Sequence, residues 1–403
     1  MLLAVGARIV AAGRGRVGVA AFREWWFVST HPRRYAYIDA LRGLAILGVM
    51  ATHLIGLFPG MPGWSRKLAG LGAHGVDLFF VASAVTLMLS WHARRGTDRS
   101  LAFSFYVRRL FRIAPMFWLA LVTYSALHPL WPQFWQSGLF TVRSQWLTAT
   151  FLHGWSPDSI NSVVPGGWTI AAEMSFYAAF PILALAISSA SRAVALVICS
   201  MMVAAAANAW AAVAWSGTAH AELGSFLLWW LPNNLPAFAI GILAYQLLPY
   251  ARQGRWVLPL WGTCAALISY LVVAGKLPWA SSWTHLVSRG TAMAACAMGL
   301  VLCLSANPTR LLVNPTMRHI GKVSYSAYLI HFLVVEAFRQ VFGPSELSGL
   351  PAVLVYGLSL LLVAGITVAV STITQRVIER RGVRWGEALI SSMHKPLLSR
   401  PLH

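Results

Sequence analysis

Ten apolar stretches, each about long enough to cross a bilayer, follow one another along the 403-residue chain. A transmembrane helix needs about 20 predominantly apolar residues to cross the hydrocarbon core. Only 10% of the residues are charged, whereas soluble domains carry about 25%. The sequence therefore predicts an all-α, polytopic membrane protein of about ten transmembrane helices. The predicted spans are residues 37–57, 72–91, 113–131, 168–187, 193–215, 226–247, 256–274, 285–305, 324–342 and 351–373.

The lysine and arginine residues predict the orientation of these spans. An even number of spans places both termini on one side of the membrane. If that side is the cytoplasm, the inner segments hold 25 of the 31 basic residues and the outer segments hold six. Cytoplasmic loops carry the excess of Lys and Arg, so both termini are predicted to be cytoplasmic. The net charge of +20 then faces the cytoplasm, as in a multi-pass protein of the inner membrane, and requires no nucleic-acid partner.

Composition divides the chain into three parts. Residues 1–34 are a basic extension predicted to lie in the cytoplasm, residues 35–375 form the ten-helix membrane domain, and residues 376–403 are a basic cytoplasmic tail. The segment Gly13–Gly18 has the G-x-G-x-x-G spacing of a dinucleotide-binding loop. However, no strand precedes this segment and no βαβ pattern follows it, so that interpretation fails.

The four cysteines stand singly in apolar runs, without the clustered Cys and His spacing of a metal site. They are predicted to be small buried side chains, and no metal is expected. They are Cys199, Cys264, Cys296 and Cys303.

Ionisable side chains inside predicted spans are candidate functional residues, because placing a charge in the bilayer is costly. Arg42 and His53 are eleven residues apart in the first span, which puts them on one helix face about 16 Å apart. Asp77 and Glu173 lie at the same predicted depth as His53. A carboxylate beside an imidazole orients it as a general base, so we predict His53 as the base with Asp77 or Glu173 orienting it. The alternatives are a structural histidine and carboxylates that stabilise helix N-termini.

Arg109 and Arg112 are three residues apart and share one helix face at the predicted inner surface. Their guanidinium groups suit a phosphorylated ligand, although snorkelling arginines that only set the topology are the alternative. In the ninth span, Tyr328 lies one turn before His331. A histidine at this depth is more typical of a helix–helix hydrogen bond than of catalysis, so both residues are predicted to have supporting roles.

Taken together, these segments resemble the acyltransferase 3 family of integral-membrane acyltransferases, which modify sugars and other hydroxylated acceptors. The matching segments cover residues 35–375 and are Arg42-x10-His53, Gly75–Ser83, Arg109–Pro115, Trp168–Tyr177 and Ser324–His331. The chain departs from the family at Ala84, where a glycine is usual, and at Met174, where a second acidic or amide residue is frequent. The second departure leaves the carboxylate role to Glu173, and Trp168 is a further supporting residue.

The resemblance implies a stand-alone enzyme, without the hydrolase-like domain that some relatives append. Its donor substrate would be cytoplasmic acyl-CoA, usually acetyl-CoA, with no permanently bound cofactor, and Arg42, Arg109 and Arg112 would hold this donor. The acceptor would be a hydroxyl of a saccharide or lipid-linked glycan at the outer half of the membrane, beneath the loop of residues 132–167. His53 would remove the hydroxyl proton, either for direct attack or through an acyl-histidine.

Two other classes of protein compete with this interpretation. A transporter or flippase would use the intramembrane Arg, His, Asp and Glu residues as a proton or substrate path. It predicts inverted repeats, which the sequence does not show. A non-catalytic membrane subunit predicts a damaged site, whereas Arg42, His53 and Glu173 are all present.

Overall fold

The computed structural model describes residues 35–131, except 97 and 99, and residues 139–215, 220–252, 288–342 and 351–394, together with 254 and 262. These residues form helices and turns and contain no strand, which confirms the all-α prediction. Residues 1–34, the predicted span 256–274 apart from residue 262, and residues 395–403 lie outside this part of the chain.

Eight described helical segments are long and apolar enough to cross a membrane, and they correspond to eight of the ten predicted spans. The ninth predicted span is the helix α15 (Ser324–Val341), which is less apolar because it contains Glu336 and Arg339. The eight segments are Ala36–Leu57, Gly63–Arg94, Leu101–Leu127, Trp168–Ala186, Ala190–Ala214, Leu223–Ala251, Arg289–Ala306 and Ala352–Met393.

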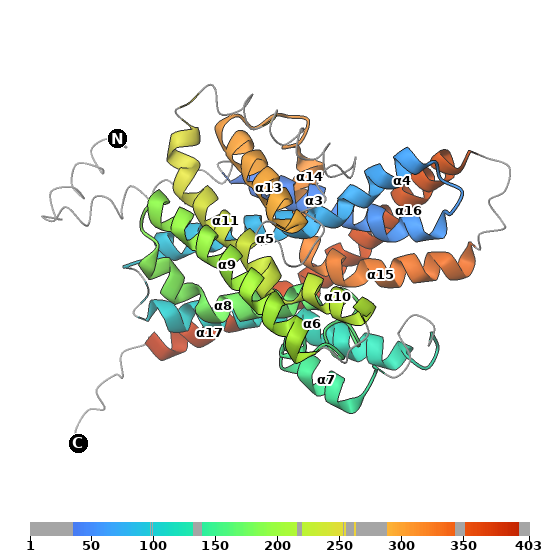
Figure 1. Ribbon diagram of the computed structural model, residues 1–403, viewed down its shortest axis with the longest axis horizontal. Coiled ribbons are helices and arrows are strands. Elements are labelled where there is room, and N and C mark those ends of the chain that lie inside the picture. The colour runs from blue at the N-terminus through green and yellow to red at the C-terminus, as the bar shows by residue number, and fades with distance from the viewer. Residues whose placement is uncertain are drawn as a thin grey trace, which may run out of the picture.

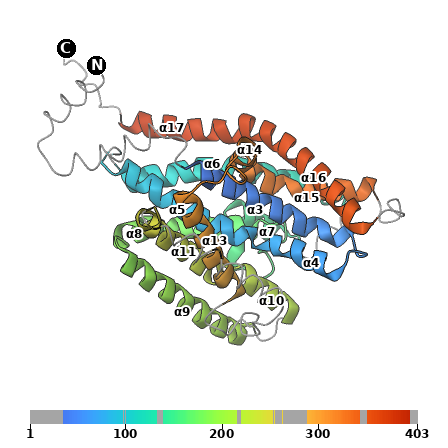
Figure 2. The ribbon, with the colours of Figure 1, turned by 90° about the horizontal axis from the view of Figure 1, so that it is seen from above.

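The first helix, α3 (Ala36–Leu54), lies in the middle of the bundle, packed against α5 (Gly75–Arg94), α14 (Pro315–Lys322) and α15. A second group is built around α11 (Leu231–Ala251), which packs on α5, α9 (Ala190–Ala214) and α13 (Arg289–Ala306). In Figure 2, α9 runs along the side of the bundle opposite α16 (Ala352–Thr374). The core therefore centres on α3 and α5, which carry the first two matching motifs (Figure 1).

Helix α16 does not end at the predicted membrane boundary. It continues through one π-helical turn, Gln375–Glu379, into α17 (Arg380–His394). Most of the predicted tail is therefore helical, and α17 packs against α6 (Leu101–Leu127) (Figure 2). Gly382 and Gly386 permit this contact, since a Cβ on Gly382 would lie 2.4 Å from the carbonyl oxygen of Phe111.

Close backbone contact also joins α14 to α3. A Cβ on Gly321 would lie 1.6 Å from the carbonyl oxygen of Asp39, and one on Gly43 would lie 2.4 Å from that of Met317. Only glycine allows two backbones to approach so closely. This contact carries Lys322, which follows Gly321 directly, to the same end of α3 as Arg42.

The departure at Ala84 has a structural counterpart on α11. Ala84 is fully buried, and a Cβ on Gly241 would lie 2.6 Å from the Cβ of Ala84. The extra methyl group on α5 thus faces a residue without a side chain, which allows α5 and α11 to pack closely.

The predicted outer loop, residues 132–167, is described from residue 139 onward and is folded, and we call it the outer cover. It contains α7 (Val142–Ala149), which begins with a capping box between Thr141 and Ser144, and a short 3-10 turn, His153–Trp155. Val163 and Val164 are buried in the main core, so this segment packs on the bundle.

His153 in this segment makes the stability of the fold sensitive to pH. Its side chain is buried, its Nε2 lies 3.0 Å from Gly167 O, and burial lowers its pKa to about 4 from the ordinary 6.5. Between these values the unfolded chain binds a proton that the folded chain excludes, so stability falls as the pH drops from 6.5 toward 4, by up to about 3 kcal/mol. His153→Gln keeps an N–H donor without this titration, so the change in its unfolding temperature between pH 7 and pH 5 should be smaller. An equal change in the variant and the wild type would contradict the assignment.

One cysteine prediction is wrong. Cys303 is buried and Cys296 is partly buried, but Cys199 on α9 is exposed. Helix α9 lies at the side of the bundle (Figure 2), so a small apolar residue there faces the surroundings. Cys264 lies outside the described residues.

Candidate active site

A pocket lies among α3, α5, α6, α8 (Trp168–Ala186) and α15. It collects the three predicted donor-binding residues, Arg42 from α3 and Arg109 and Arg112 from α6. Arg42 is held by a hydrogen bond from its Nη2 to Thr86 Oγ1 at 3.2 Å. We call this cavity the arginine pocket. The structure thus brings together residues that are about 70 positions apart in the sequence.

Arg109 is positioned for an anionic or polar ligand. Its guanidinium carbon lies 5.7 Å from the ring centre of Phe105 and 5.9 Å from that of Tyr177. Its Nε is buried and has no hydrogen-bond partner among the described residues. A buried N–H without an acceptor costs about 1–3 kcal/mol, so an acceptor group in the pocket would relieve a real penalty.

A second and larger cavity adjoins the arginine pocket. Both cavities are lined by Arg42, Arg112, Gly321 and Lys322. The second is lined by six basic residues against two acidic ones, and we call it the basic pocket. Its charged residues are Asp39, Arg42, Arg112, Lys322, Arg376, Glu379, Arg380 and Arg384.

The basic residues that the π-helical turn and α17 add to this site were not predicted from the sequence. Arg376, Arg380 and Arg384 were assigned to a cytoplasmic tail, yet they line the basic pocket. Their spacing of four residues was the available signal, because it places them on one helix face. What the spacing could not show is that α16 continues as one helix and packs back along α6.

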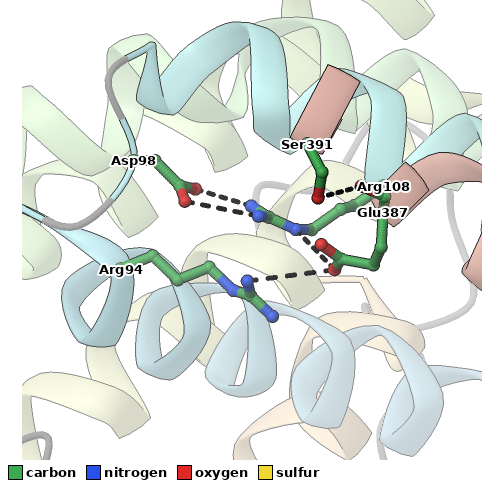
Figure 3. A network of polar contacts seen from close by, with 5 residues as sticks. All are labelled: Arg94, Asp98, Arg108, Glu387 and Ser391. Atoms are coloured by element: carbon green, nitrogen blue, oxygen red, sulfur yellow. Dashed lines mark hydrogen bonds and ion pairs between the residues drawn. The ribbon is translucent and has the colours of Figure 1, made fainter. Parts of the chain in front are cut away.

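Helix α17 is fastened by a polar network (Figure 3). Arg108 donates from Nη1 to Asp98 Oδ2 at 2.6 Å and from Nε to Glu387 Oε1 at 2.8 Å. Arg94 lies 3.9 Å from the same Glu387 oxygen, and Ser391 donates to the Glu387 carbonyl oxygen. Arg108 therefore holds α17 in place, while its neighbour Arg109 serves the arginine pocket.

Glu173 lies in the arginine pocket. It accepts hydrogen bonds from Ser83 Oγ at 2.5 Å and from the hydroxyl of Tyr177. Asp77 pairs instead with His74, whose Nδ1 lies 2.7 Å from Asp77 Oδ2. Neither carboxylate contacts His53, so the expected orienting contact is absent among these described residues. Predicted depth was an insufficient guide, because it does not specify the direction in which a side chain leaves its helix.

The partner of His53 is a second histidine. His53 Nδ1 lies 3.1 Å from His331 Nε2, and His331 Nδ1 lies 2.7 Å from the carbonyl oxygen of Tyr328. His331 is fully buried, whereas His53 is exposed. The ring of Phe332 packs on both imidazoles, with centroids 4.4 Å from His53 and 4.1 Å from His331.

The two remaining predicted residues lie at different places. Tyr328 lines the arginine pocket, and its hydroxyl donates to Gly166 O at 3.1 Å. It therefore lies between this pocket and the histidine pair, one turn before His331. Trp168 begins α8 and packs against Phe80 and Trp229, with ring centres 6.3 and 6.1 Å away. Its described contacts are thus aromatic packing.

Comparison with known proteins provides the family of this chain. The model of the acyltransferase 3 family, described as an acyltransferase domain, matches residues 35–374. The chain belongs to this acyltransferase family. The match confirms the resemblance found in the motifs, and with the apolar helices it makes the protein a multi-pass membrane acyltransferase.

The chain is also similar to two named proteins. The exopolysaccharide production protein ExoZ of Rhizobium meliloti (strain 1021) is 27% identical over 291 residues, which cover 67% of this acyltransferase and 78% of ExoZ. The acyltransferase MdmB of Streptomyces mycarofaciens is 26% identical over 341 residues, covering 77% and 81% of the two chains. No solved structure matches this acyltransferase significantly.

Proposed function

We propose that this acyltransferase moves an acyl group, in the first instance acetyl, from cytoplasmic acyl-CoA to a hydroxyl of an exported saccharide or lipid-linked glycan. The observation that carries the proposal is the pair of adjoining cavities with a shared set of basic residues. Acyl-CoA has a polyanionic nucleotide end and a long neutral arm that ends in a thioester. A basic pocket that opens into a narrower, more enclosed one suits a ligand of that shape and charge.

Each pocket would bind a different part of the acyl-CoA donor. The six basic residues of the basic pocket would bind the phosphates, with bidentate guanidinium contacts. The arm would enter the arginine pocket past Arg42, which lines both cavities, and extend between Phe79 and Tyr328. Arg109, whose buried Nε has no partner in the described part of the chain, would bind a polar group of the arm. This arrangement directs the thioester along α3 toward the histidine pair.

His53 is the proposed general base at the other end of α3. It lies about 16 Å along the helix from Arg42, and its exposure leaves the ring open to an acceptor. The acceptor hydroxyl gives its proton to His53 as its oxygen bonds to the thioester carbonyl carbon. The carbon–sulfur bond then breaks, and the departing CoA thiolate takes the proton from His53.

The acceptor class is the part of the proposal that draws on a relative. ExoZ is named for exopolysaccharide production, so exported polysaccharide and its lipid-linked precursors are the first acceptors to examine. Mass spectrometry of envelope and exported glycans from cells with and without the gene should show a gain of one acyl unit on one glycan.

Release of free CoA tests the reaction itself. Purified protein in liposomes, given acetyl-CoA and the glycan identified above, should release one free thiol for each acetyl group gained by the glycan. Empty liposomes and protein without glycan serve as controls. Movement of the glycan across the bilayer without thiol release would instead support the transporter interpretation and overturn the proposal.

A further inference from the structure

We propose that His331 is a positioning residue that holds His53 in the tautomer needed to accept a proton. The inference rests on the proposed role of His53 as the base. It begins from three polar atoms in a row, namely the Tyr328 carbonyl oxygen, His331 and His53. Their separations are 2.7 Å from Tyr328 O to His331 Nδ1 and 3.1 Å from His331 Nε2 to His53 Nδ1.

The first contact determines the protonation of His331. A carbonyl oxygen can only accept a hydrogen bond, so His331 Nδ1 must carry the hydrogen in this contact. A neutral imidazole has one N–H group, and its other nitrogen is an acceptor. His331 is fully buried, and no acidic side chain pairs with it in the described part of the chain. The neutral ring therefore presents Nε2 as an acceptor.

The second contact then determines the tautomer of His53. Because His331 Nε2 accepts, His53 Nδ1 must donate, and the remaining nitrogen of His53, Nε2, holds the free lone pair. His53 is the exposed member of the pair. The nitrogen able to take a proton is thus on the ring that an acceptor can reach, while the other ring is enclosed.

Packing keeps this arrangement in place. Phe332 contacts both imidazoles, and Tyr328 is tied to the outer cover through Gly166. A Cβ on Gly166, whose φ is +74°, would lie 2.9 Å from both Phe332 and the Tyr328 hydroxyl. His331 thus takes the orienting part that the sequence assigned to a carboxylate, with a backbone carbonyl fixing its own tautomer.

Variants at position 331 distinguish positioning from simple packing. In His331→Gln, the amide oxygen can occupy the place of Nε2 and still accept from His53. His331→Leu and His331→Met fill space but accept nothing. We expect kcat to fall by about 10–100-fold in the two apolar variants, with the KM for acetyl-CoA unchanged, and to recover to within a few-fold of wild type in His331→Gln.

Tyr356→Phe is the matched control. Tyr356 donates from α16 to the Ala51 carbonyl oxygen at 2.8 Å, so its loss removes a hydrogen bond that holds the same stretch of α3 without touching the imidazoles. The control should lower the unfolding temperature and leave kcat near wild type. A drop in kcat equal to that of His331→Leu would mean that helix packing explains both results, and would overturn the proposal.

The remaining outcomes separate the two proposals. Wild-type kcat in a folded His331→Leu or His331→Met would overturn the positioning role, as would His331→Gln being no more active than those variants. Full activity of His53→Ala in the same assay would instead disprove the base assignment on which the inference rests. Thermal unfolding and gel filtration in detergent show whether His331→Leu and His331→Met are folded. The kcat of a folded apolar variant is the value compared with the wild type.

Discussion

Replacing His53 by alanine is expected to lower kcat for acyl transfer by about 10²–10⁴-fold, the contribution usual for a positioned general base. The ring is the exposed member of the histidine pair, and it is the proposed proton acceptor. The affinity for acyl-CoA should stay near wild type, because His53 lines neither pocket and Arg42, the pocket residue on the same helix, is about 16 Å away along α3. Equilibrium binding of radiolabelled acetyl-CoA and initial rates on the same preparation provide both values.

His319→Ala is a suitable control for this variant. His319 also makes a helix–helix hydrogen bond, with its Nε2 3.0 Å from Thr372 Oγ1, but it lies on α14 and lines neither pocket. Its loss should leave kcat close to wild type. If both alanine variants lose activity to the same extent, the result reflects damage to the bundle, and the assignment of His53 fails.

The same assay distinguishes direct transfer from an acyl-histidine intermediate. Direct attack by the acceptor predicts no rapid release of CoA when the acceptor is absent. An acyl-histidine would give a burst of about one CoA per protein molecule, and His53→Ala would abolish that burst. The lone pair on His53 Nε2 could act as a base or as a nucleophile, so the presence or absence of this burst decides between the two routes.

The sequence was sufficient for the fold class and for placing Arg109 and Arg112 on one helix face. Span positions follow from hydropathy, and a spacing of three residues puts Arg109 and Arg112 on one face. The different roles of residues adjacent in the sequence were harder to predict. Arg108 and Arg109 stand side by side in the sequence, yet one holds α17 and the other lines a pocket. Their partners come from residues up to 279 positions away, and single-sequence patterns do not contain such pairings.

The partner of His53 was missed for a related reason. Counting residues from a membrane edge estimates depth, and Asp77, Glu173 and His53 do match in that respect. Contact also requires two side chains to point at each other, which depends on how helices are rotated and packed. The helix that faces His53 is α15, from the far end of the chain, so the orienting group is an imidazole.

The second large effect is expected at the donor site. Arg109→Gln and Arg112→Gln should each raise the KM for acetyl-CoA by about 10–100-fold, since a hydrogen bond to a charged group contributes about 1.5–3 kcal/mol. The KM for the acceptor should change little. Arg192→Gln is the control. Arg192 is exposed, donates a hydrogen bond from its side chain to the carbonyl oxygen of Ala186, and lines neither pocket. An unchanged KM for acetyl-CoA in both pocket variants would show that the donor does not bind at this site.

Acetyl-dephospho-CoA, which lacks the 3′-phosphate, tests the basic pocket separately from the arginine pocket. If the basic pocket binds the nucleotide end, the wild type should prefer acetyl-CoA over the dephospho form, and Arg380→Gln with Arg384→Gln should reduce that preference. Arg109→Gln, deeper along the arm, should weaken both donors equally and keep the ratio. High salt should narrow the preference as well, because attraction between accessible charges is screened. If the preference for acetyl-CoA over acetyl-dephospho-CoA is the same in the Arg380 and Arg384 variants as in the wild type, α17 has a structural role only. The donor site would then be restricted to the residues that α3 and α6 supply.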